Sequence, residues 1–164
     1  MNEQPTRKIP GLFPLALSCI AFVVLYLILS YYNRLAADDY FYLDKAEHLG
    51  VWNGMLASYH TWVTRWFSIL FLNGVLFSTI HFHSLLPYHV FTLLVLIAVV
   101  FRLIRVVLEK FRIPRLNLAT LLLYSMLVVA SLFFFSFSIS EVWFWTAATT
   151  MYLWSLIFLM IGIA

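Results

Sequence analysis

Charged residues are scarce in this sequence. Of its 164 residues, only 10% are Asp, Glu, Lys or Arg, whereas 64% are hydrophobic. Soluble domains carry about 25% charged residues, and a water-soluble fold of this length could not bury so much apolar surface. The composition therefore excludes an ordinary soluble domain and indicates a protein covered largely by lipid.

Cysteine and the common catalytic motifs are almost absent as well. The single cysteine, Cys19, lies inside the first apolar run, so no intrachain disulfide can form. There is no Walker loop, no dinucleotide-binding glycine pattern, no Gly-x-Ser-x-Gly and no His-Glu-x-x-His. The net charge of +3 arises from basic residues at the ends of apolar segments rather than along one face. This distribution argues against nucleic-acid binding.

Four apolar segments are long enough to cross a bilayer, which takes about 20 residues. They are about 12–32, 86–106, 117–138 and 146–164. A cleaved signal peptide is the alternative for the first, but its length and the lack of a small-residue cleavage site favour an uncleaved span. We expect one all-α membrane domain over 1–164, a polytopic transmembrane helical bundle, and an N-terminal part of a longer multi-pass chain.

A fifth apolar stretch, about 66–80, is shorter and more polar, so the charges must decide whether it crosses. Cytoplasmic loops are rich in Lys and Arg. If 66–80 does not cross, the basic residues at 102–115 and Arg7 and Lys8 lie on the same, cytoplasmic side. We therefore predict four spans, a cytoplasmic N-terminus in a bacterial cytoplasmic membrane, and interfacial helices in an outer loop at 33–83. Five of the seven acids then lie outside: Asp38, Asp39, Asp44, Glu47 and Glu141.

Asp38 and Asp39 follow the first span directly. Two adjacent carboxylates at a membrane interface are costly to desolvate, so we expect them to face water, a cation or a polar ligand. One of them is a candidate general base, with or without a divalent metal. The alternative is that one caps a short helix from Tyr40 to Leu49, which Gly50 would end. The two roles are compatible.

A second group, Tyr59, Trp62, Arg65 and Trp66, recurs at steps of three and four residues and so shares one helical face. It is either an aromatic belt with an anchoring Arg or a site where Arg65 binds a phosphate and the rings stack on a sugar or lipid.

A third group lies at the start of the last span. On one continuous helix, Glu141, Trp145, Thr149 and Tyr152 would align as a polar stripe that enters the membrane from the outer face. A lone Glu could instead favour a helix N-terminus.

Three histidines, His81, His83 and His89, lie close together in sequence. His81 and His83 would point apart on a helix, and no carboxylate is near. We interpret them as interfacial residues rather than metal ligands.

Together these residues resemble the start of a GT-C-type membrane glycosyltransferase. The acidic motif is Ala37-Asp38-Asp39-Tyr40, the stretch 59–66 resembles a Tyr-x-x-Trp-x-x-Arg segment, and 141–154 resembles a later Trp-x-Thr-Gly…Tyr-Leu-Trp segment. The chain departs from these patterns at Thr64 and Ala147, where the family would have glycine.

The resemblance implies a polyprenyl-phosphate-linked sugar as donor and a lipid-linked glycan, polymer or protein as acceptor. It implies that Asp38 or Asp39 is the base that deprotonates the acceptor and that Arg65 lies near the donor phosphate. The substrate-binding residues would be Tyr40, Tyr59, Trp62, Arg65, Glu141, Trp145 and Tyr152. A transporter or flippase, or a non-catalytic membrane subunit, are the alternatives, although the spans 86–101 and 117–137 contain no charge, Pro or Gly apart from Pro87 at the first turn.

Overall fold

The computed structural model describes residues 12–61, 66–113 and 116–163, and every regular element within these ranges is helical. This confirms the all-α prediction. The longer helices are α1 (Leu12–Tyr32), α2 (Ala37–Thr61), α3 (Trp66–Phe82), α4 (Leu86–Lys110), α5 (Leu118–Phe134) and α7 (Trp154–Ile163). Before α7 come two π-helical turns, η1 (Ser140–Phe144) and η2 (Thr149–Leu153), with the short α6 (Thr146–Ala148) between them.

Three helical segments are long and apolar enough to span a membrane: α1, α4 and the run Thr146–Ile163. They coincide with the predicted segments at 12–32, 86–106 and 146–164. The segment predicted at 117–138 is shorter, because α5 has 17 residues and ends at Phe134. At 1.5 Å per residue, such a helix extends about 26 Å, against a hydrocarbon core of about 30 Å. The helix α3 also has 17 residues.

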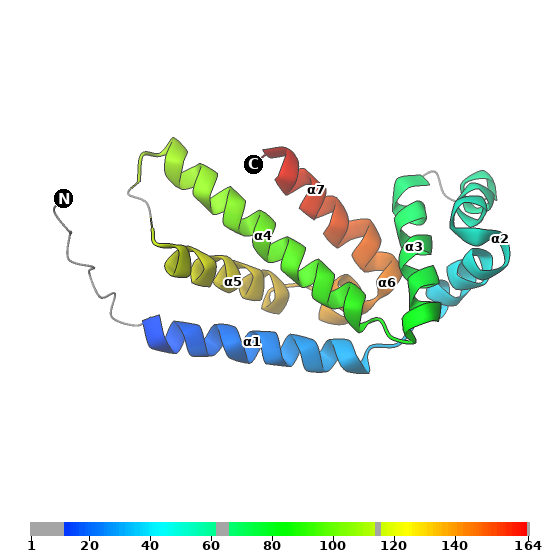
Figure 1. Ribbon diagram of the computed structural model, residues 1–164, viewed down its shortest axis with the longest axis horizontal. Coiled ribbons are helices and arrows are strands. Elements are labelled where there is room, and N and C mark those ends of the chain that lie inside the picture. Colours follow the sequence, from blue (N-terminus) through cyan, green and yellow to red (C-terminus); the bar gives the residue numbers. More distant parts are fainter. Residues whose placement is uncertain (1–11, 62–65, 114–115, 164) are drawn as a thin grey trace.

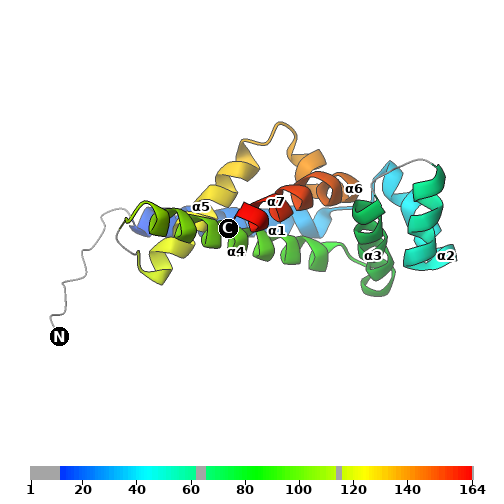
Figure 2. The same cartoon turned by 90° about the horizontal axis from the view of Figure 1, so that it is seen from above.

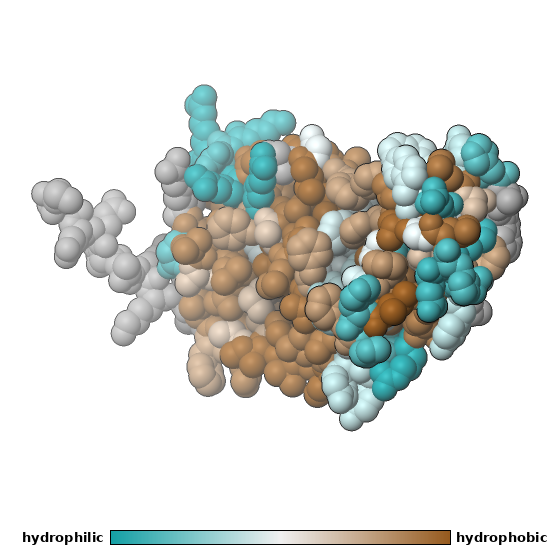
Figure 3. All heavy atoms as spheres, turned by 45° about the vertical axis from the view of Figure 1, so that its right-hand side comes forward, coloured by the Kyte–Doolittle hydropathy of each residue, from teal (hydrophilic) through white to brown (hydrophobic). Residues whose placement is uncertain are grey.

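The helices form a bundle with a crosswise end. In both views α1, α4 and α7 extend along the length of the molecule, and α5, which contacts α1 and α4, crosses them obliquely in Figure 2; α3 lies across one end and packs on α2 (Figures 1 and 2). The N-terminus of α1 and the α4–α5 connection lie at the other end (Figure 1). On the face shown in Figure 3, apolar side chains fill the middle of the bundle, and hydrophilic ones gather toward its two ends. This distribution is typical of a membrane protein.

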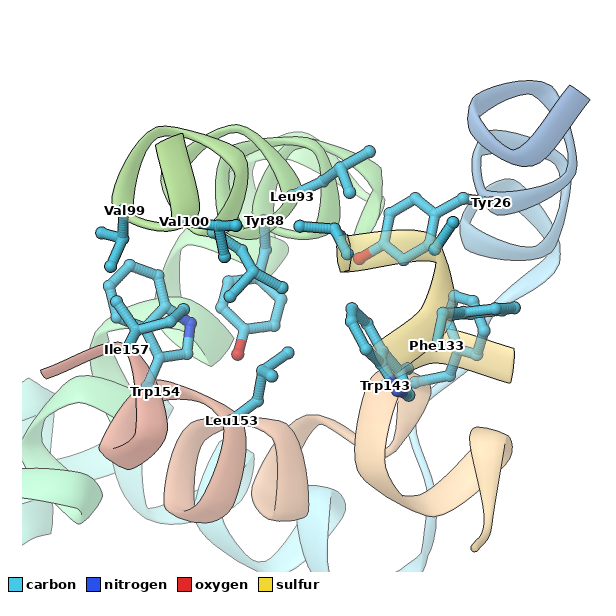
Figure 4. Packing of buried hydrophobic residues seen from close by; sticks show 14 of the residues in the cluster. Tyr26, Tyr88, Leu93, Val99, Val100, Phe133, Trp143, Leu153, Trp154 and Ile157 are labelled. Atoms are coloured by element: carbon cyan, nitrogen blue, oxygen red, sulfur yellow. The ribbon is translucent and has the colours of Figure 1, made fainter. Parts of the chain in front are cut away.

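Aromatic side chains dominate the interior of the bundle. Tyr26 of α1, Phe133 of α5 and Trp143 of η1 meet at one end of it, with ring centroids 5.2 to 6.2 Å apart (Figure 4). Tyr88 of α4 lies beside Trp154 and above Leu153 in the same view (Figure 4). Buried indole N–H groups need partners: Trp143 donates to the Ser136 hydroxyl at 2.7 Å. These contacts hold the segment before α7 against α1 and α5.

Gly50 divides α2 into two halves, as the sequence predicts. Its backbone has φ 77° and ψ 166°, a region open essentially only to glycine. Beyond it, the second half of α2 folds back toward the first, since a Cβ on Gly54 would lie 3.1 Å from the Lys45 carbonyl oxygen. The bend therefore builds the helical hairpin against which α3 packs.

Gly50→Ala should lower the free energy of unfolding by about 2 kcal/mol, because alanine must adopt a strained backbone there. Gly74→Ala is the matched control. A Cβ at Gly74 meets no atom within 4 Å, and alanine favours a helix by about 1 kcal/mol over glycine. Unfolding followed by circular dichroism in detergent measures both. Equal stability of the two variants would contradict the role of Gly50.

Candidate functional site: the acidic start of α2

The two adjacent aspartates have opposite surroundings. Asp39 is fully buried, at 0% exposure, whereas Asp38 is exposed. Both lie in the first turn of α2, immediately after the first span. The expectation that both carboxylates face water or a ligand is therefore wrong for Asp39, and only Asp38 of the pair is open to the outside of the molecule.

Asp39 is held by backbone N–H groups on both carboxylate oxygens. The N–H of Ala36 donates to Oδ2 at 3.0 Å, while the N–H of Asp39 donates to the Ala36 carbonyl at 2.8 Å. This reciprocal pair resembles a capping box. The other oxygen, Oδ1, accepts the N–H of Ala147 at 2.9 Å. One side chain thus caps α2 and connects it to α6, far along the chain. The predicted cap preceded a helix that begins at Tyr40. In the structure the helix begins at Ala37, and Asp39 binds the Ala36 N–H from within its first turn.

The contact with Ala147 follows from a break in the chain at Trp145. This residue has an extended backbone, with φ −74° and ψ 112°. The first N–H groups of a helix have no partner within the helix. The side chain of Trp145, which precedes α6, does not cap them. Asp39 supplies the missing acceptor from another helix. A carboxylate also suits a helix N-terminus electrostatically.

The same break overturns the predicted stripe at the start of the last span. Glu141 and Thr149 belong to different helical segments, separated by the extended Trp145. Glu141 is exposed, but Thr149 is fully buried and its hydroxyl donates to the Trp145 carbonyl at 2.9 Å. Tyr152 is 60% exposed. These side chains therefore do not form one polar face, because a continuous helix was assumed where the backbone is extended.

Burial controls the electrostatics of the pair. Desolvation raises the pKa of Asp39 above its ordinary value, and the N–H groups of Ala36 and Ala147 oppose this rise only in part. The pKa of the Tyr42 phenol is also raised, by burial first and then by the negative charge of Asp38. The negative charge of Asp38 therefore acts on the neighbouring Tyr42 side chain.

Two hollows open at this end of the bundle and share Asn33 and Arg34 as a wall. The larger, of about 550 Å³, is lined by residues that include Tyr40 and His83. The smaller, of about 280 Å³, is lined by residues that include Glu141 and Trp145. Both hollows contain charged and hydroxyl side chains. The predicted residues Tyr40, Glu141 and Trp145 therefore lie around one segment, the chain that leaves α1.

Asn33 holds this wall in place. Its amide nitrogen donates to the Phe144 carbonyl at 2.7 Å and lies 2.8 Å from Nε2 of His89. Because an amide nitrogen only donates, Nε2 must accept and the ring proton sits on Nδ1. That Nδ1 is buried without a partner among the described residues. His89 is fully buried, so the prediction of an interfacial residue is wrong for it. The sequence analysis did not predict Asn33, Arg34 and His89 as residues of this site. The adjacent polar residues Asn33 and Arg34, directly after the first apolar segment, were a usable signal.

The structure describes only part of the predicted group Tyr59, Trp62, Arg65 and Trp66. Trp62 and Arg65 lie outside the described residues. Tyr59 is in the last turns of α2, beyond the Gly50 bend, with its ring against His60 at a centroid distance of 5.6 Å. Asp38 and Asp39 are at the opposite end of this kinked helix.

The donor set does not fit a protein-held metal ion. Within the described ranges, no three His, Cys, Asp or Glu side chains lie close enough to share one. At the acidic motif, both oxygens of Asp39 already accept N–H groups. Asp38 alone is a weak ligand set for a divalent cation.

Comparison with protein-family models, curated proteins and solved structures finds no match for this chain.

Proposed function

We propose that the chain is the membrane-embedded part of a GT-C-type glycosyltransferase, which moves a sugar from a polyprenyl-phosphate donor to an acceptor at the outer face of the membrane. The observation that supports this best is the contrast between the two aspartates. Asp39 fixes the start of α2 to α6, and the exposed Asp38 beside it is positioned on a rigid element, as a general base requires.

In this proposal Asp38 takes the proton of the acceptor hydroxyl. The hydroxyl oxygen attacks the anomeric carbon of the sugar, the bond from that carbon to the phosphate oxygen breaks, and the polyprenyl phosphate leaves. Attack opposite the leaving group inverts the anomeric centre. Arg65 would balance charge on the departing phosphate. Tyr40, Glu141 and Trp145, which line the two hollows, would contact the sugar or the acceptor.

The proposed topology has four spans: α1, α4, α5 and the run from Thr146. The crosswise direction of α3 (Figures 1 and 2) supports an interfacial helix rather than a span. The basic residues Arg102, Arg105, Lys110 and Arg112 lie at the end of the bundle opposite α3 and would be cytoplasmic. The acidic motif and both hollows would then face the cell envelope, in a bacterial cytoplasmic membrane.

Asp38→Asn should lower sugar transfer about 10³-fold, which is typical for loss of a general base. Membranes containing the native protein or the variant are assayed with a radiolabelled polyprenyl-phosphate sugar. Asp44→Asn is the matched control, because Asp44 lies exposed on the same half of α2 and its ion-pair partner among the described residues is His48, at 3.3 Å. Unchanged transfer by Asp38→Asn at normal protein level would remove Asp38 as the base. Unchanged transfer by both Asp38→Asn and Asp39→Asn would end the transferase proposal.

A transporter or flippase is the second candidate, and the break at Trp145 favours it. Discontinuous helices with buried polar groups form the substrate sites of many transporters. Here the extended Trp145 is followed by buried Thr146, Thr149 and Thr150. This candidate predicts lipid or solute movement across vesicles that survives Asp38→Asn. A non-catalytic subunit would tolerate the same variant without showing either activity.

A further inference from the structure

An apolar groove of about 500 Å³ lies between α3 and the start of α4. Apolar side chains, five of them aromatic, form most of its walls, and the rings of Phe82 and Phe91 are 65% and 55% exposed. Gly74 lies in its floor and has open space around it, since a Cβ there meets no atom within 4 Å. The groove is therefore unfilled by the described side chains. Its lining includes Phe67, Phe71, Gly74, Phe82, Pro87 and Phe91.

One end of this groove adjoins the larger of the two hollows. Thr79 and Ser84 line both. Along this path the walls change from aromatic rings to polar side chains, among them Arg34 and His83. A ligand that follows the whole path must be apolar over most of its length and polar at one end.

The polar end carries the positive charge of Arg34, which forms no ion pair with any described residue. The guanidinium of Arg34 donates to the carbonyl oxygens of Tyr31 at 3.2 Å and Asn33 at 2.9 Å. The ion pairs of the described residues involve other side chains, His48 with Asp44 and Arg105 with Glu109. The remaining N–H groups of Arg34 fit a phosphate. The imidazole of His83 is a further donor at this hollow.

We propose that this groove binds one anionic phospholipid of the surrounding bilayer. An acyl chain lies between α3 and α4, and the phosphate lies against Arg34. The bilayer is the solvent of this surface, so hydrocarbon is the medium that fills an apolar groove open to it. The unpaired charge of Arg34 selects an anionic over a zwitterionic headgroup. The phosphate would share the larger hollow with Tyr40, but the proposal rests on the apolar groove and on Arg34, and not on Asp38 or on sugar transfer.

The test uses the full chain in mild detergent after removal of native lipid. The midpoint of thermal unfolding is titrated with phosphatidylglycerol, with phosphatidylcholine and with inorganic phosphate. For the wild type, phosphatidylglycerol should bind about fivefold more tightly than phosphatidylcholine, as expected for one basic side chain at a headgroup, and inorganic phosphate should have no effect. Arg34→Gln should bind the two lipids equally.

Gly74→Phe tests the groove itself, because the new ring enters open space and blocks the acyl chain. It should lose the response to both lipids. Gly162→Phe is its control: Gly162 also has open space, on α7, and lies outside the groove. Equal responses of these two variants would overturn the proposal. So would a midpoint shift by inorganic phosphate equal to that by phosphatidylglycerol. Displacement of phosphatidylglycerol by equimolar polyprenyl phosphate would instead assign the groove to a polyprenyl lipid.

Discussion

Asp39→Asn should destabilise the fold by about 2 kcal/mol, whereas Asp38→Asn should change it by less than about 0.5 kcal/mol. An asparagine has one acceptor oxygen, so either the Ala36 or the Ala147 N–H would face the amide NH₂. Asp39→Ala removes both acceptors and should cost about 3 kcal/mol, since a buried donor without a partner costs about 1 to 3 kcal/mol. Thermal unfolding of the purified chain in one detergent compares all three.

Asp38 and Asp39 are adjacent residues of the same type that differ in burial, so each substitution is the control for the other. A loss of stability in Asp38→Asn as large as that in Asp39→Asn would contradict the assignment of the cap to Asp39. Amide hydrogen exchange adds a local readout. In Asp39→Asn, exchange should accelerate at the start of α2 and at Ala147, and the remote Gly50 bend should be unaffected.

This pair also shows where sequence reasoning ends. The helix after the first span and its division at Gly50 were predictable, because they depend on local properties: an apolar run that stops at a polar pair, and a residue that adopts positive φ. The burial of Asp39 was not, because its partner Ala147 is 108 positions away. No local pattern separates Asp38 from Asp39, and only the packed α2–α6 contact does.

The break at Trp145 has the same origin. No Pro or Gly lies between Ser140 and Thr150, so the sequence predicts a continuous helix and a stripe through Glu141 and Thr149. The structure has π-helical turns on both sides of an extended residue. Helix ends with no local cap need acceptors from elsewhere, and the carboxylate of Asp39 is one that only the tertiary fold provides. Irregularities of this kind occur often at functional sites.

Cysteine labelling tests whether α3 crosses the membrane or lies on its outer side. We expect cysteines placed at His60 and His83, which flank α3, to react from the same, outer side of the membrane. A membrane-impermeant maleimide is applied to intact cells and to permeabilised cells. Both histidines are exposed, so access is limited by the membrane and not by packing. The native Cys19 is 2% exposed, so its background labelling should be low.

His48→Cys and Lys110→Cys calibrate the two sides. His48 lies on α2 and should react in intact cells, whereas Lys110, at the end of α4, should react only after permeabilisation. The basic residues near Lys110 favour the cytoplasm, and α4 has 25 residues, enough to cross the core between His83 and Lys110. Labelling at His60 and His83 from opposite sides would mean that α3 crosses. The densest basic cluster would then lie on the outer face if the N-terminus stays cytoplasmic, and the acidic motif would no longer share a side with Glu141.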